Sequence, residues 1–190
     1  MGTGASISIE EYLRTSYHPD REYRDGVITE RNVGDEAHSI LQRQLIRYVG
    51  NRARQWQIEV YPELRIRFRE NWYPVPDVCV YLLPEPVGRF PATMPLLWIE
   101  ILSHDDRMVE VWQKAKDLVE CGAPYVWIIE PNSLDSQLMT ASGGPNHVPG
   151  KTLAIPGTPI DSARGRDGRV AWPIPPAPAR TRRSSSSTAL

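Results

Sequence analysis

Three short runs of apolar residues constrain the fold of this chain more than any other feature. They are DVCVYL at 77–82, LLWIEIL at 96–102 and PYVWIIE at 124–130. Each run has the length of a strand and is apolar on both alternating faces, which is typical of strands covered on both sides of a sheet. Because segments with helical periodicity lie before and between these runs, the sequence predicts an α/β fold with a mixed sheet flanked by helices.

Two helices are predicted ahead of the first run. Ser8 and Glu11 have the spacing of a capping box, which indicates a short helix that ends before Pro19. A longer helix is expected to open at Asp35 and to continue as far as Trp56. Its apolar residues Leu41, Leu45 and Val49 recur at helical spacing.

A third helix is predicted between the second and third runs. Ser103 or Asp105 can cap its first turn, and Gly122 can end it. Its apolar face comprises Met108, Val111, Trp112, Ala115, Leu118 and Val119.

A half-buried strand is predicted where apolar and basic residues alternate, from Leu64 to Arg69. Leu64, Ile66 and Phe68 would face the core, with Arg65, Arg67 and Arg69 on the other side. Three donors on one strand face are candidates for phosphate binding, whereas a solvated basic face explains the pattern equally well. Another short strand is expected over 27–31, after the Asp25-Gly26 turn.

The composition excludes several classes of protein. The 190 residues carry a net charge of −1, which excludes a strongly basic protein that coats nucleic acid. No apolar run approaches the length of a membrane span, so we expect no membrane partner. The two cysteines, Cys79 and Cys121, form no C-x-x-C pair, which favours a reducing compartment and a cytoplasmic location.

The charge and the prolines are unevenly distributed along the chain. Eight of the 18 prolines lie in residues 145–178, and residues 161–190 contain six Arg but two acidic residues. The net charge is therefore +4 over 161–190 and −5 over 1–160. We predict one folded domain over 1–160 and a basic Pro- and Ser-rich tail over 161–190 that is disordered, because it has too few large apolar residues to form a core.

The candidate catalytic residues are carboxylates in the apolar runs. Asp77 opens the first run and Glu100 lies inside the second, where a carboxylate rarely occurs without a partner. If the two strands are neighbours, the carboxylates converge as a site for Mg²⁺ or Mn²⁺. Equally, Asp77 could cap a turn while Glu100 pairs with an arginine of the neighbouring strand.

A nearby cation would complete such a site. Lys114 and Lys116 flank the apolar face of the third helix on opposite sides, and the helical periodicity does not choose between them. Glu63, after Pro62, is a further candidate; a surface glutamate facing Arg65 or Arg67 is the simpler explanation.

Several segments together resemble a known family. They are REYRDG at 21–26, His38, PELRIRF at 62–68, VPDVCVYL at 75–82, PLLWIEILSHDDR at 95–107 and GAPYVWIIEP at 122–131. In order and spacing they resemble the Uma2 family of restriction-endonuclease-like proteins, within the PD-(D/E)XK nuclease superfamily. The resemblance extends from about Glu11 to Pro131. Residues 153–160 still resemble the family's C-terminal part, and the residues after Asp161 do not.

The resemblance implies a nuclease core that binds Mg²⁺. Asp77 matches the acid of the PD motif, and Glu100 matches the acid of the E-x-L-S motif, with the carbonyl of Ile101 as a further ligand. The superfamily lysine is replaced here by Leu102, and the family position for a lysine on the following helix is Lys114. By the same resemblance Glu22 is an outer-sphere or second-metal ligand. Glu63 and His38 also match recurrent positions.

Three functions are consistent with these residues. The leading hypothesis is a Mg²⁺-dependent DNA endonuclease that uses Asp77, Glu100 and Lys114. A non-catalytic nucleic-acid-binding or regulatory protein on a nuclease fold is the alternative, and a hydrolase of another phosphodiester is the third. Because residues 1–160 are acidic, DNA affinity would come from a local basic patch or from a homodimer.

Overall fold

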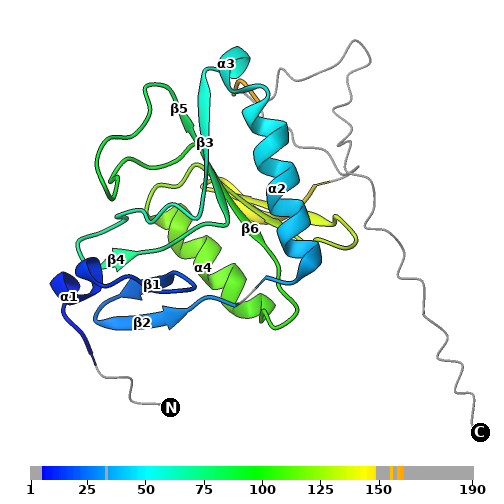
Figure 1. Cartoon of the computed structure of the whole chain (residues 1–190). Helices are drawn as coiled ribbons and strands as arrows, with labels where there is room; N and C mark the ends of the chain where they lie inside the picture. Colours follow the sequence, from blue (N-terminus) through cyan, green and yellow to red (C-terminus); the bar gives the residue numbers. More distant parts are fainter. Residues whose placement is uncertain (1–5, 33, 149–154, 156–157, 161–190) are drawn as a thin grey trace, which may run out of the picture.

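The computed structural model describes residues 6–32, 34–148, 155 and 158–160, and contains a six-stranded sheet with a helix on each face (Figure 1). The strand order is β3-β5-β6-β7-β8-β9, in which β6 and β7 are parallel and the other neighbours are antiparallel. The strands are β3 (Ile58–Pro62), β5 (Val78–Leu82), β6 (Leu97–Ile101), β7 (Tyr125–Ile129), β8 (Ser136–Thr140) and β9 (Gly143–His147). The predicted mixed sheet flanked by helices is confirmed.

The three apolar runs become the neighbouring strands β5, β6 and β7, because each buries side chains on both faces. Helix α2 (Glu36–Gly50) covers one face, where Leu41 and Leu45 pack on Val80 and Ile99. Helix α4 (Met108–Glu120) covers the other. There Ala115 and Leu118 pack against Cys79, Tyr81, Trp98, Val126 and Ile128.

A second, smaller sheet lies beside α4 and has the strand order β2-β1-β4 (Figure 1). Its strands are β1 (Arg21–Arg24), β2 (Val27–Glu30) and β4 (Trp72–Tyr73), and helix α1 (Ile9–Arg14) packs on it. The side chain of Ser8 accepts a hydrogen bond from the Glu11 amide, so the predicted N-cap at Ser8 is confirmed. The sequence predicted β2 but not its partner β1.

The prediction of a strand over 64–69 is wrong. The edge strand is β3, and the chain turns at Glu63, which has a φ of +47°. Beyond it residues 64–68 belong to no strand and their amides bond irregularly: the Ile66 amide donates to Pro74 and the Arg67 amide to Pro91. The alternation predicted burial in part: Ile66 and Phe68 are buried, but Leu64 is only partly buried and the Arg65 side chain is only 11% exposed. Side chains can therefore alternate between core and surface in a segment that joins no ladder.

Three details of the predicted helices are also corrected. Trp56 lies on a separate short helix, α3 (Ala53–Trp56), because α2 ends at Gly50. Neither Ser103 nor Asp105 caps α4, whose N-cap position is Arg107 and has no side-chain hydrogen bond. Trp112 was predicted on the apolar face, but its exposed fraction is 38%, since its indole donates to Gln137 at the protein surface.

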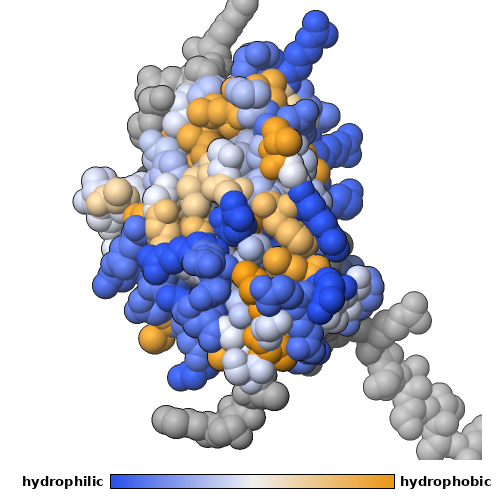
Figure 2. All heavy atoms as spheres, turned by 90° about the vertical axis from the view of Figure 1, so that its left-hand side faces the viewer, coloured by the Kyte–Doolittle hydropathy of each residue, from blue (hydrophilic) through white to orange (hydrophobic). Residues whose placement is uncertain are grey.

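The face that carries the small sheet is largely hydrophilic, with smaller apolar areas between the polar ones (Figure 2). Within the described part of the chain, none of the helices combines the length and apolar character needed to cross a bilayer. The predicted tail over 161–190 lies outside the described residues.

Candidate active site

Asp77 immediately precedes β5, and Glu100 lies in β6, its antiparallel neighbour. The register pairs Val78 of β5 with Ile99 of β6, so one step further along the ladder sets Asp77 opposite Glu100. The amide of Ile101 donates to Asp77 Oδ2 at 2.7 Å, which fixes the carboxylate beside the end of β6. The predicted convergence of the two carboxylates therefore rests on this strand pairing.

Lys114 of α4 joins this pair of carboxylates from the helix above the sheet. Its Nζ lies 2.6 Å from Oε1 of Glu100 and 2.6 Å from Oε1 of Glu22. The indole of Trp98 also donates to Glu100 Oε1, at 2.6 Å. Lys116, by contrast, is exposed and pairs with Glu120 one turn along the helix, at 3.8 Å. Between the two lysines, the structure brings Lys114 to the carboxylates.

Glu22 reaches Lys114 because β1 docks on α4 through two ion pairs. Alternate side chains of β1 share a face, so Glu22 and Arg24 both point to the helix, where Arg24 pairs with Asp117 at 2.5 Å. Lys114 and Asp117 are three residues apart and lie on one side of α4. Glu22 also accepts a hydrogen bond from the Val75 amide at 3.1 Å.

Asp77 is the most buried carboxylate of this group, with a side chain 6% exposed. Arg31 donates to its Oδ1, and His38 Nε2 lies 3.3 Å from its Oδ2. His38 comes from the first turn of α2. Gly34 leaves room for its imidazole, since a Cβ there would lie 2.4 Å from Nδ1.

The charges of these residues shift one another's pKa values. Burial acts to raise the pKa of Asp77, but the hydrogen bond from His38 and the charge of Arg31 outweigh it and lower that pKa. Burial raises the pKa of Glu100 to about 7, although Lys114 acts in the opposite direction. Burial disfavours the charged form of Lys114, yet Glu100 and Glu22 raise its pKa above the ordinary value. Lys114 is therefore held as an ammonium ion.

These groups line a polar cavity of about 180 Å³. The side chains in it are Glu22, Thr29, Glu30, Arg31, Asn32, His38, Asp77, Glu100, Ile101, Leu102, Ser103, Asp106, Glu110, Val111 and Lys114. The oxygen donors of Asp77, Glu100 and the Ile101 carbonyl suit a hard cation such as Mg²⁺. No cage of three or more His, Cys, Asp or Glu side chains occurs among the described residues, and Mg²⁺ does not need one, because it commonly keeps several waters.

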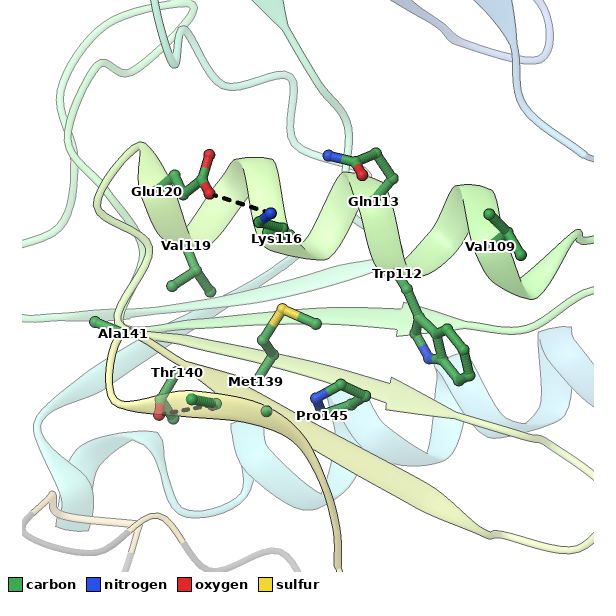
Figure 3. A pocket seen from close by; sticks show the side chains of 12 residues that line it. Val109, Trp112, Gln113, Lys116, Val119, Glu120, Met139, Thr140, Ala141 and Pro145 are labelled. Atoms are coloured by element: carbon green, nitrogen blue, oxygen red, sulfur yellow. Dashed lines mark hydrogen bonds and ion pairs between the residues drawn. The ribbon is translucent and has the colours of Figure 1, made fainter.

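A larger cavity of about 490 Å³ lies between α4 and the β8–β9 hairpin (Figure 3). Its lining includes the apolar side chains of Val109, Trp112 and Met139, while its charged residues, Lys116 and Glu120, pair with each other. This cavity lacks converging carboxylates, so the smaller polar cavity is the better candidate for catalysis.

Some predicted site residues lie elsewhere. Arg65 forms an ion pair with Asp20 and stacks on Tyr12, and neither Arg65 nor Arg67 lines the polar cavity. Glu63 is adjacent to the cavity, since its Oε1 lies 3.7 Å from Arg31.

Arg31 is a cavity residue that the sequence analysis missed. It follows β2 in a segment with no motif, and only the pairing of β2 with β1 brings it over Asp77.

The Asp117 ion pair gives a testable pH dependence. Burial opposes the shift, but hydrogen bonds from Arg24 and Gln113 lower the pKa of Asp117 below its ordinary 3.8. The stabilisation is thus complete above the unfolded-state pKa and is lost as the pH falls through the folded-state pKa. Urea unfolding of wild type and Asp117→Asn should give a larger difference at about pH 7 than at about pH 3. An equal difference at both pH values would contradict this role.

The comparisons with known proteins agree with the fold. Residues 9–152 match the Uma2 family, whose description is "Putative restriction endonuclease". No curated protein matches the sequence. The solved structure of a "putative nuclease belonging to DUF820" from Anabaena variabilis matches with a TM-score of 0.69 and 21% identity, over 82% of this chain and 96% of that one. Because the family match spans most of the chain, the resemblance drawn from the sequence motifs is confirmed, and this protein belongs to the Uma2 family.

Proposed function

We propose that this protein is a metal-dependent endonuclease that hydrolyses DNA phosphodiester bonds. The observation that carries the proposal is the position of the Lys114 ammonium group, 2.6 Å from the carboxylates of both Glu22 and Glu100 in the polar cavity. Membership of the Uma2 family supports a nuclease in general. The metal, the DNA substrate and the roles of individual residues are our proposals.

Asp77, Glu100 and the backbone carbonyl of Ile101 would hold Mg²⁺ or Mn²⁺, with Glu22 in an outer-sphere position. When bound, the cation would stabilise negative charge on the phosphate and lower the pKa of a bound water. Two carboxylates are sufficient for a Mg²⁺ that keeps waters and also contacts substrate phosphate. Trp98 and Lys114 orient the Glu100 carboxylate toward this task, since both contact its Oε1.

Lys114 would donate hydrogen bonds from Nζ rather than accept a proton. Two carboxylates hold it as an ammonium ion, and a general base needs a neutral amine. Donors placed where charge develops stabilise the transition state of phosphoryl transfer. We therefore assign Lys114 to orienting the attacking water and stabilising the negative charge on the reacting phosphate.

A non-catalytic nucleic-acid-binding protein is the second candidate function. One observation favours it: both oxygens of Asp77 already accept hydrogen bonds from protein donors, Arg31 on Oδ1 and Ile101 on Oδ2. A protein that binds no metal could retain Asp77 as an acceptor of these hydrogen bonds. The two candidates predict the same fold and differ in whether DNA is cleaved.

Incubation of the purified protein with supercoiled plasmid DNA decides between them. The nuclease proposal predicts nicked or linear product with Mg²⁺ or Mn²⁺ and none with EDTA. A Glu100→Gln preparation, purified in parallel, controls for contaminating nucleases and should be inactive. DNA retention in a gel-shift assay without cleavage under any metal condition would favour the binding protein, and product formed equally by Glu100→Gln would refute the site.

A further inference from the structure

Arg31 occupies the polar cavity in a way that no motif explains. It follows β2, and its guanidinium contacts Oδ1 of Asp77 and lies 3.7 Å from Oε1 of Glu63. Its side chain is 15% exposed. A cation of the protein therefore sits against the carboxylate that a metal ion would use.

Oδ2 of Asp77 faces two protein donors, the Ile101 amide and His38 Nε2, whereas Oδ1 carries the guanidinium of Arg31. A metal ion that approaches Oδ1 therefore meets the full positive charge of Arg31, which must withdraw for the ion to take its place. The Ile101 amide is part of the backbone of β6, and His38 lies in the first turn of α2. Arg31 differs from both because its long side chain reaches in from beyond a strand end and has several rotatable bonds. It is the donor that can withdraw without breaking a helix or a sheet.

The charges in the cavity also favour an exchange. Six acidic residues line the cavity against two permanent cations, Arg31 and Lys114; the acidic residues are Glu22, Glu30, Asp77, Glu100, Asp106 and Glu110. A divalent cation would add two positive charges beside Arg31 and repel it, while a DNA phosphate would bring a negative charge to the same opening. Guanidinium groups bind phosphate oxygens through paired hydrogen bonds, so the phosphate offers Arg31 a new partner.

We infer that Arg31 fills the cation position on Asp77 in the metal-free protein, gives it up to the divalent ion, and then binds the phosphate of the nucleic acid. This inference rests on the proposed metal site. The exchange explains how Asp77 can be paired with Arg31 in the metal-free protein and still bind a metal ion for the reaction. Arg31 is on this account a positioning residue before the metal binds and a substrate contact afterwards.

Arginine modification of the wild-type protein tests the exchange without any substitution. Phenylglyoxal labelling is quantified by peptide mass spectrometry, with the exposed Arg107, which pairs with Glu110, as internal reference. Mn²⁺ is expected to increase the labelling of Arg31 several-fold and to leave Arg107 unchanged. Labelling of Arg31 that stays constant or decreases with Mn²⁺ would overturn the inference.

Metal affinity provides the second test, with Mn²⁺ binding followed by electron paramagnetic resonance. Arg31→Gln removes the competing charge and should bind Mn²⁺ about tenfold more tightly, equivalent to about 1.4 kcal/mol. Arg31→Lys should remain near wild type, and so should the matched control Arg107→Gln. Unchanged or weaker Mn²⁺ binding by a folded Arg31→Gln, or no Mn²⁺ binding by wild type, would contradict the exchange.

The outcomes separate this inference from the nuclease proposal. Neither labelling nor Mn²⁺ affinity depends on DNA cleavage, so both can succeed with a protein that cleaves nothing. In that case the exchange stands and the nuclease proposal fails. If wild type cleaves DNA while Arg31→Gln keeps wild-type metal and DNA affinity, the nuclease stands and the role of Arg31 is refuted.

Discussion

Replacing Lys114 by methionine is expected to lower the rate of metal-dependent DNA cleavage about a hundred- to a thousand-fold, the range observed when one donor to a developing charge is removed. Methionine keeps most of the aliphatic stem but has no ammonium group. The variant also leaves Glu22 and Glu100 facing each other without the cation that joins them. Single-turnover cleavage of plasmid DNA at saturating Mg²⁺ measures the loss.

Lys116→Met is the matched control, because it makes the same substitution two residues further along the same helix. Lys116 is exposed and pairs with Glu120, outside the polar cavity. It should retain wild-type cleavage. An equal loss in both variants would indicate a general effect of the helix lysines on DNA binding, and full activity of Lys114→Met would remove Lys114 from the site.

The choice between these two lysines illustrates what the sequence could predict. Helical periodicity placed both at the borders of the apolar face, at equal angles from its centre. The resemblance to the Uma2 family favoured Lys114, and the structure brings it to the carboxylates. The deciding element is β1, since Glu22 and Arg24 dock on the side of α4 that carries Lys114 and Asp117. This four-residue strand has three charged residues and one buried aromatic, Tyr23, which is too few to show a hydrophobic period, so β1 could not be predicted from its pattern.

The central strands were predictable for the opposite reason. β5, β6 and β7 are buried on both faces, and burial of this kind leaves continuous apolar runs in the sequence. A carboxylate inside such a run is conspicuous, which is how Glu100 was found. Arg31 was missed because its role depends on its contact with Asp77, which lies 46 residues further along the sequence. Local spacing carries no information about such a contact.

The segment 64–69 shows that alternation in the sequence does not by itself identify a strand. Its alternation predicted the burial of Ile66 and Phe68 but placed the strand in the wrong segment. Burial depends on which side chains face the core, whereas membership of a sheet depends on which backbone amides find partners. The Arg67 amide bonds to Pro91 in a distant loop, a partner that alternation cannot reveal.

Asp77→Ala is expected to lower the free energy of unfolding by about 3–5 kcal/mol, as for other buried ion pairs that lose one partner. The change leaves the guanidinium of Arg31, whose side chain is 15% exposed, without its carboxylate partner at Asp77. It also removes the acceptor of the Ile101 amide. Such a loss is a large fraction of the total stability of a single domain. Urea unfolding followed by tryptophan fluorescence in metal-free buffer measures it.

Two further variants separate stability from catalysis at this position. Asp77→Asn keeps an oxygen that can accept from Ile101, so it should be less destabilised than Asp77→Ala while still lacking the charge a metal requires. The exposed Asp105→Ala should unfold like wild type. If Asp77→Ala proves as stable as Asp105→Ala, the buried network around Asp77 contributes nothing to folding. If instead it is destabilised as expected, loss of cleavage in Asp77→Ala alone says nothing about metal binding, and the folded Asp77→Asn variant becomes the one whose activity tests the metal site.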